Sequence, residues 1–223
     1  MITKAGLLIS LTILIISAPA LVFAGDIISA PPEQAAADTH YVFYLHGQIV
    51  QELGLRPTHP RYGLYDYPLI LEALAADGIT VISQRREPGT RPEQYAEVVA
   101  RQVNKLLASG AQPGNITVVG FSVGGVITIR TSSMLVDTDI SFVILAACSS
   151  WISNEPDMRL YGHVLSVFEK SDQPGSCKKL AKRKPRPLSF DEFSINTGKE
   201  HGAFYLPDQA WLVPVLDWIQ RQQ

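Results

Sequence analysis

The stretch of residues 115–131 constrains the fold of this chain more than any other. Residues 115–119 (NITVV) are mostly β-branched and predict a buried strand, and residues 125–131 (GVITIRT) predict the first turns of a helix. Between them, residues 120–124 (GFSVG) form a G-x-S-x-G pattern, which in this context indicates a sharp turn that exposes the hydroxyl of Ser122. The two glycines fit a close approach of strand and helix that leaves no room for a Cβ atom. The alternative is an ordinary glycine-rich turn.

The rest of the chain alternates between apolar runs of strand length and segments with helical spacing. This alternation predicts an α/β fold, with a mostly parallel central sheet and helices on both faces. No repeat or break in composition divides the chain, so residues 25–223 are predicted to form a single domain. Glycines and prolines predict a long loop at 48–67. The predicted strands are 40–45, 79–83, 115–119, 140–147, 164–168 and 190–196, and further helices are predicted at 68–76, 92–109, 178–184 and 208–222.

The composition is that of an ordinary globular protein, with 46% hydrophobic and 18% charged residues among 223. The formal net charge is -2, so no strong field of one sign favours nucleic acid or an anionic membrane surface. Two basic groups stand out. Arg85, Arg86 and Arg91 predict a solvated loop, with binding of a substrate carboxylate or phosphate as the alternative. Residues 178–186 hold six basic side chains, which predict a solvated helix face or, alternatively, a patch for an anionic surface or partner.

Residues 1–24 predict a secretory signal peptide. A short positive region precedes the apolar residues 6–16, and Val22 and Ala24 fit the small residues before a cleavage site. Cleavage is expected after Ala24, with the A-P-A sequence at 18–20 as a second candidate. An uncleaved membrane anchor is the alternative, although the apolar stretch is near the lower limit for spanning a bilayer. The protein is thus predicted to be exported, periplasmic or secreted, with no stable membrane span after cleavage.

A serine hydroxyl needs a general base to become a nucleophile, and that base needs an acid that orients it. In folds with this type of turn, the partners follow the serine in the order Asp or Glu, then His. His163 starts a predicted strand at the opposite edge of the sheet, whereas His201 lies in a loop at the edge that carries Ser122. His201 is therefore the predicted base. An exposed loop histidine is the alternative.

The acid is predicted in the loop that follows the strand at 164–168. Asp172 lies far enough along this loop to turn back toward His201. Glu169 directly adjoins the strand and is the second candidate, and a solvated aspartate in a turn is the third interpretation.

Two backbone N–H groups should stabilise the negative charge that develops on the substrate oxygen. The first is predicted at Val123, where the start of a helix favours negative charge. The second is predicted at Gln48, because Gly47 lets the chain turn sharply after its strand. His46 is expected to brace this loop rather than to take part in the chemistry.

With His46-Gly47 and with Ser122, Asp172 and His201 in this order, the chain resembles an α/β-hydrolase over residues 40–222. The resemblance implies an eight-stranded sheet, although the pattern predicts six strands. It also implies hydrolysis through an acyl-enzyme, with neither a metal ion nor an organic cofactor. It implies no particular substrate, because this fold hosts many activities.

The sequence departs from many of these relatives in the size of the segment after Cys148. A large lid domain often follows that strand, whereas here only residues 149–163 are available. A minimal lid or none is therefore predicted. The site should be open or covered mainly by residues 48–67.

The predicted function is that of an exported serine hydrolase, and among serine hydrolases the prediction favours a carboxylic ester hydrolase. It would cleave an ester, thioester or amide of a small-molecule or acylated substrate. An acyltransferase would use the same residues, and a non-catalytic binding protein on this fold is the rival from another class.

The chain contains two cysteines, Cys148 and Cys177. The first ends one predicted strand and the second lies in the loop after the next, so both fall at the same edge of a parallel sheet. Export would place them in an oxidising compartment. A disulfide is therefore predicted, with two separate buried thiols as the alternative.

Overall fold

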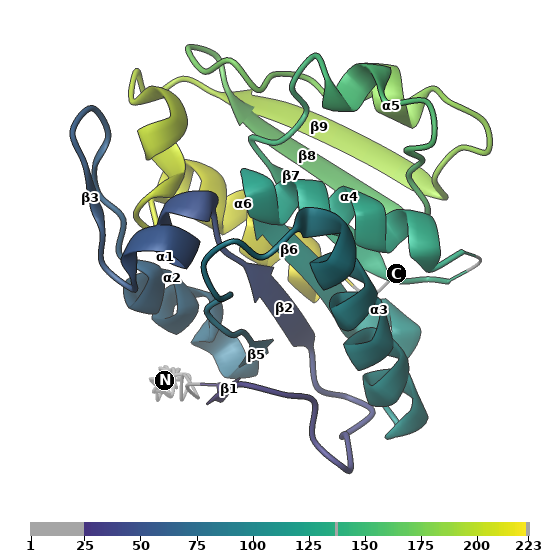
Figure 1. Ribbon diagram of the computed structural model, residues 1–223. Helices are drawn as coiled ribbons and strands as arrows, with labels where there is room; N and C mark the ends of the chain where they lie inside the picture. The colour runs from purple at the N-terminus through teal and green to yellow at the C-terminus, as the bar shows by residue number, and fades with distance from the viewer. Residues whose placement is uncertain (1–24, 137, 222–223) are drawn as a thin grey trace, which may run out of the picture.

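The computed structural model describes residues 25–136 and 138–221, so the predicted signal peptide lies outside the described residues. Within them, seven strands form a sheet in the order β1-β5-β2-β6-β7-β8-β9, and all neighbouring strands are parallel (Figure 1). The predicted α/β class and mostly parallel sheet are thereby confirmed. The strands are β1 (Ile27–Ile28), β2 (Tyr41–Leu45), β5 (Thr80–Ile82), β6 (Ile116–Phe121), β7 (Ser141–Leu145), β8 (His163–Glu169) and β9 (Ser189–Ile195).

Helices cover both faces of the sheet, and each face has its own apolar core (Figure 1). Because side chains alternate along a strand, Phe43 of β2 points into one core and Tyr44 into the other. No helix in the described part of the chain is long and apolar enough to cross a membrane. On the Phe43 side lie α3 (Pro92–Ala108), α4 (Val123–Met134) and α5 (Lys178–Ala181), and on the Tyr44 side lie α1 (Gln48–Leu53), α2 (Tyr67–Leu74) and α6 (Gln209–Gln220).

The prediction of a continuous loop at 48–67 is wrong in part. This segment contains α1 and an antiparallel hairpin of β3 (Thr58–His59) and β4 (Gly63–Leu64). The helix has six residues and each hairpin strand has two, which is too few for a hydrophobic period to appear in the sequence. The two-residue strand β1 was missed for the same reason.

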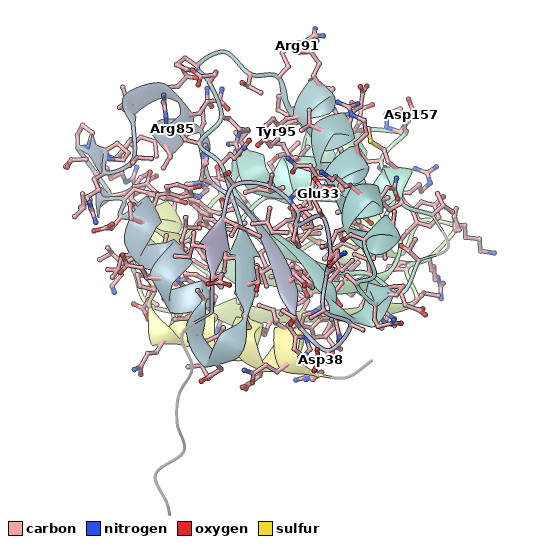
Figure 2. All side chains as sticks on the ribbon, turned by 90° about the horizontal axis from the view of Figure 1, so that it is seen from below. Glu33, Asp38, Arg85, Arg91, Tyr95 and Asp157 are labelled. Atoms are coloured by element: carbon pink, nitrogen blue, oxygen red, sulfur yellow. A yellow bond between two sulfur atoms is a disulfide. The ribbon has the colours of Figure 1, made fainter. Side chains whose placement is uncertain are left out.

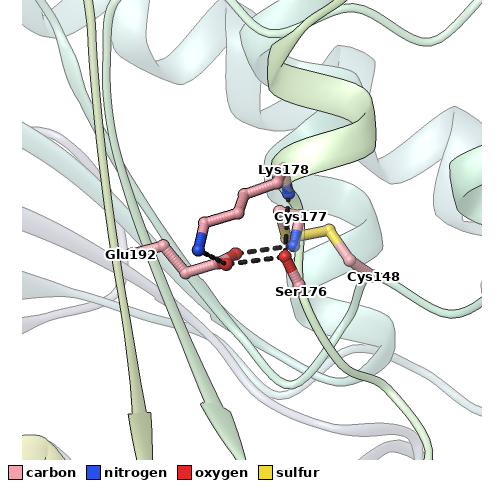
Figure 3. Close-up of a disulfide and its surroundings, with 5 residues drawn as sticks. All are labelled: Cys148, Ser176, Cys177, Lys178 and Glu192. Carbon is pink, nitrogen blue, oxygen red and sulfur yellow. Dashed lines mark hydrogen bonds and ion pairs between the residues drawn. A yellow bond between two sulfur atoms is a disulfide. The ribbon is translucent and has the colours of Figure 1, made fainter.

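Cys148 and Cys177 form the predicted disulfide, with their Cα atoms 5.2 Å apart (Figure 3). Glu192 of β9 accepts hydrogen bonds from the Cys177 backbone N–H and from Ser176 Oγ, both at 2.6 Å. Its side chain is only 2% exposed, and Lys178 Nζ lies 3.7 Å away. The disulfide and this carboxylate together fasten the end of the loop after β8 to the sheet.

Candidate active site

Ser122 lies in the sharp turn between β6 and α4, as the sequence predicts. Its backbone angles are φ 56° and ψ -119°, a conformation that costs a residue other than glycine about 1–3 kcal/mol. The flanking glycines are required sterically. A Cβ atom on Gly124 would lie 1.8 Å from the Leu45 carbonyl oxygen, and one on Gly120 would lie 2.2 Å from the Gly124 carbonyl oxygen.

His201 and Asp172 are brought together from two separate loops at this edge of the sheet. His201 lies in the short helix η4 (Glu200–Phe204), and its Nδ1 atom is 2.5 Å from Asp172 Oδ2. The Asp172 side chain is 6% exposed and the imidazole 18% exposed, so water has little access to this bond. Asp172, and not Glu169, is therefore the carboxylate that contacts the histidine.

One cavity of about 320 Å³ joins Ser122 and His201, which both line it. Its walls are largely aromatic. The Phe121 ring centroid lies 4.7 Å from that of His201, and the Tyr62 ring centroid lies 6.1 Å from it. The remaining lining residues are Gly47, Gln48, Ile49, Glu52, His59 and Tyr205.

The segment 48–67 supplies much of this lining, as expected, whereas no described residue of 149–163 takes part in it. The sequence pattern does not predict Ile49, Glu52, His59 or Tyr205 as lining residues. The sequence offers one signal for the first three of these residues, namely a long segment that follows a strand at the sheet edge carrying Ser122. It identifies the segment but not the side chains that turn inward.

Glu169 is completely buried between the loops that carry Asp172 and His201. One oxygen accepts hydrogen bonds from the Ser171 N–H (3.4 Å) and Oγ (3.2 Å), and the other from the Thr197 N–H (2.8 Å) and Oγ1 (2.9 Å). Burial by itself raises the pKa of Glu169, but the hydrogen bonds from Thr197 and Ser171 outweigh it and hold the pKa below its ordinary value. The carboxylate thus ties the two loops together.

His46 is a buried structural ring, as expected. Its Nε2 atom accepts the Arg86 backbone N–H at 2.9 Å, so Nδ1 carries the proton and donates it to the Gly47 carbonyl oxygen at 2.8 Å. Burial and the neighbouring positive charge of Arg86 lower the pKa of His46 to about 3, and the imidazole is neutral. The ring braces the turn from β2 into α1.

The three arginines of the predicted solvated loop have different surroundings, and that prediction is wrong for Arg86. Its side chain is buried, with Nη2 donating to the His46 carbonyl oxygen at 2.5 Å and Nε to Gln51 Oε1 at 3.0 Å. Figure 2 shows Arg91 at the edge of the molecule where α3 begins, and it is exposed. None of the three, including Arg85, is among the residues that line the cavity.

Val123 and Gln48, whose N–H groups are the predicted oxyanion donors, are the first residues of α4 and α1. N–H groups at the start of a helix have no acceptor within it and are available to other partners. Gln48 lines the cavity, and Val123 directly follows Ser122. Within the described residues, no group of three or more His, Cys, Asp or Glu side chains is placed to hold a metal ion.

No family model matches the sequence, and no curated protein matches it. Among solved structures, the chain is similar to a protein from Pectobacterium atrosepticum that is assigned as a YdeN-like hydrolase. The two chains are 12% identical and superpose with a TM-score of 0.54, over 82% of this chain and 91% of the other. A likeness at this level of identity shows a shared architecture, and this chain therefore has an α/β fold of the hydrolase type.

Proposed function

We propose that this protein is a serine hydrolase in which Ser122 is the nucleophile, His201 the general base and Asp172 the acid that orients it. The observation that carries the proposal is the 2.5 Å contact between His201 and Asp172 at a cavity that Ser122 also lines. The strained backbone of Ser122 adds support, because such strain is typical of active sites.

The first half of the reaction forms an acyl-enzyme. Ser122 Oγ attacks the carbonyl carbon of the substrate while His201 Nε2 takes the hydroxyl proton. The N–H groups of Val123 and Gln48 stabilise the oxyanion of the tetrahedral intermediate. His201 then gives its proton to the leaving group as the bond to that group breaks.

The second half repeats these steps with water as the nucleophile. His201 takes a proton from water as the water oxygen attacks the acyl carbon, and it returns the proton to Ser122 Oγ when the ester bond breaks. Asp172 holds the imidazole in the required tautomer and stabilises its charged form. Esters, thioesters and amides are the substrate class that this chemistry serves.

We also propose that the protein is exported. The disulfide between Cys148 and Cys177 supports this, because disulfides persist in oxidising compartments. The predicted signal peptide at 1–24 agrees with it.

A fluorophosphonate probe tests the assignment of the nucleophile, since such probes react quickly only with an activated serine. We expect the purified protein to be labelled at Ser122 and the Ser122→Ala variant to remain unlabelled. Ser150→Ala, at an exposed serine outside the cavity, is the matched control and should be labelled like the wild type. An unlabelled wild type would favour a binding protein, and a labelled Ser122→Ala variant would show that another residue reacts.

A further inference from the structure

The segment 173–190 contains six basic residues and no acidic one, although the whole chain has a net charge of -2. Averaging over the chain hides this local excess. The segment includes α5 and the start of β9, and it lies outside the proposed active site. The structure shows which of these basic side chains already have hydrogen-bond or ion-pair partners within the described residues and which do not.

Three of the six cations have partners within the protein. The Arg183 guanidinium donates to backbone carbonyl oxygens at Ser153 (2.8 Å), Met158 (3.2 Å) and Glu155, so the prediction of a solvated helix face is wrong for this residue. Lys179 Nζ donates to the Asn154 side chain at 2.5 Å, and Lys178 faces Glu192.

The other three cations, Lys182, Lys184 and Arg186, are exposed, and none forms an ion pair with a described residue. Lys182 and Arg186 line a cleft of about 310 Å³ together with Lys178. The apolar part of its lining comes from Ala181 and Phe190. Cationic side chains therefore share this cleft with an apolar floor, formed by Ala181 and Phe190.

Leu188 extends the apolar surface of this segment. It lies two positions from Arg186 and from Phe190, and it is 62% exposed. A large apolar side chain beside unpaired cations fits a partner that carries both negative charge and hydrocarbon.

We propose that this cleft binds an anionic lipid and thereby holds the protein at an anionic lipid surface. Lys182 and Arg186 would bind the phosphate or carboxylate head, and Phe190 and Ala181 would contact the first methylene groups of the chain. A free anion would leave the apolar floor unused, and a neutral apolar ligand would leave the cations unused. The cleft shares no lining residue with the cavity of Ser122, so this proposal is independent of the proposed reaction.

Sedimentation of the purified protein with lipid vesicles tests the proposal. We expect binding to vesicles of phosphatidylcholine mixed with phosphatidylglycerol, loss of that binding at high salt, and no binding to phosphatidylcholine alone. Each basic side chain near an anionic surface strengthens binding about fivefold, so Lys182→Gln/Arg186→Gln should weaken it roughly 25-fold. Arg91→Gln/Arg101→Gln removes the same charge from the exposed residue before α3 and from an exposed position on α3, and it should have little effect.

A second experiment distinguishes between three kinds of ligand: a lipid in a bilayer, a single amphiphile and a simple anion. Dodecyl phosphate below its micelle concentration should protect the wild type from thermal unfolding more than inorganic phosphate does, and this difference should vanish in Lys182→Gln/Arg186→Gln. Equal binding to neutral vesicles, equal weakening by the α3 variant, or equal protection by inorganic phosphate would overturn the proposal. Binding of a single-stranded oligonucleotide as tight as that of anionic vesicles would also overturn it, because it would indicate a cationic patch without lipid preference.

Discussion

The two sides of the proposed active site, called its walls below, are held in place by different kinds of interaction. The acid wall, formed by residues 169–177 and 197–201, is fastened by a disulfide, by the buried carboxylates of Glu169 and Glu192, and by the pair of Asp172 and His201. The entrance wall, residues 48–67, is anchored near its ends by the buried side chains of Gln51 and Tyr65. Between them, its hairpin meets the 197–201 loop through the ion pair of Arg61 and Glu200, whose side chains are 66% and 30% exposed.

Because the two walls are held by different interactions, we expect one to control the chemical step and the other to control access of the substrate. A carboxylate that water cannot reach keeps its hydrogen-bond partners fixed, so the acid wall can hold an imidazole within a fraction of an ångström. An exposed ion pair contributes little to rigidity, because water and salt compete for both partners. We therefore expect the acid wall to determine the rate of the chemical step and the entrance wall to determine substrate binding.

The largest effect should come from breaking the acid wall at Asp172. Asp172→Asn keeps the shape of the side chain but favours the wrong imidazole tautomer, so kcat should fall by roughly three to four orders of magnitude. Steady-state kinetics on a chromogenic ester would measure this, with the exposed Asp157→Asn as the matched control. A fall of less than tenfold would mean that Asp172 does not orient the base.

The disulfide should come next. It joins residues 29 positions apart, and its removal should lower the free energy of unfolding by on the order of 3 to 4 kcal/mol in the chain-entropy model. Denaturant titration of Cys148→Ala/Cys177→Ala against the wild type would measure the change. Because the bridge ends the loop that holds Asp172, kcat should fall as well. Unchanged kcat in the folded variant would show that Glu192 alone is enough to hold the loop.

Variants of Glu169 test whether this buried carboxylate, which does not line the cavity, affects the reaction by positioning Asp172 and His201. Glu169→Ala leaves its four donors without an acceptor and should cost about 2–4 kcal/mol of stability. It should also lower kcat while leaving KM nearly unchanged, because it loosens Asp172 and His201 but not the entrance wall. Glu169→Gln keeps one acceptor oxygen and should recover part of both losses. A proportional rise in KM would contradict this positioning role.

The pH dependence of stability should report His46, which lies where the entrance wall begins. The unfolded chain binds a proton at His46 near pH 6.5, whereas the folded chain does so only near pH 3. Between these values, each unit of falling pH should cost about 1.4 kcal/mol from this residue, and Glu169 should add to the loss only below about pH 4.5. Denaturant titrations from pH 7 to pH 5 should show a shallower slope for His46→Gln. An identical slope would mean that His46 is protonated in the folded state.

The smallest effect should come from the entrance wall. Arg61→Gln removes an ion pair that water largely screens, so the melting temperature should stay the same within error. KM should rise a few-fold because the neighbouring Tyr62 lines the cavity, and kcat should not change. A clear loss of kcat would show that the two walls are not independent.

Much of the candidate site could be predicted from the sequence, because it depends on chain order and strand ends. Ser122 and Asp172 follow strands visible as apolar runs, and His201 follows one visible as an alternating pattern. Parallel strands bring such ends to one edge. The pairing of Asp172 with His201 and that of Cys148 with Cys177 follow from this placement.

The entrance wall and the surroundings of individual charges could not be predicted in the same way. α1 and the β3–β4 hairpin are too short to produce a period, so the inward turn of His59 and Tyr62 depends on tertiary packing alone. The burial of Arg86 depends on carbonyl and amide groups of residues 46 and 51, which are distant in sequence. A charge pattern shows where cations occur but not which of them the fold will neutralise.

The backbone conformation at Ser122 has a consequence for the stability of the folded protein. Its φ of 56° suits glycine, and a chain selected only to fold would place glycine there. Any other residue at this turn makes the native state less stable than it needs to be. In the proposed function the hydroxymethyl group acts on another molecule, and position 122 is then a place where the protein gives up some of its own stability.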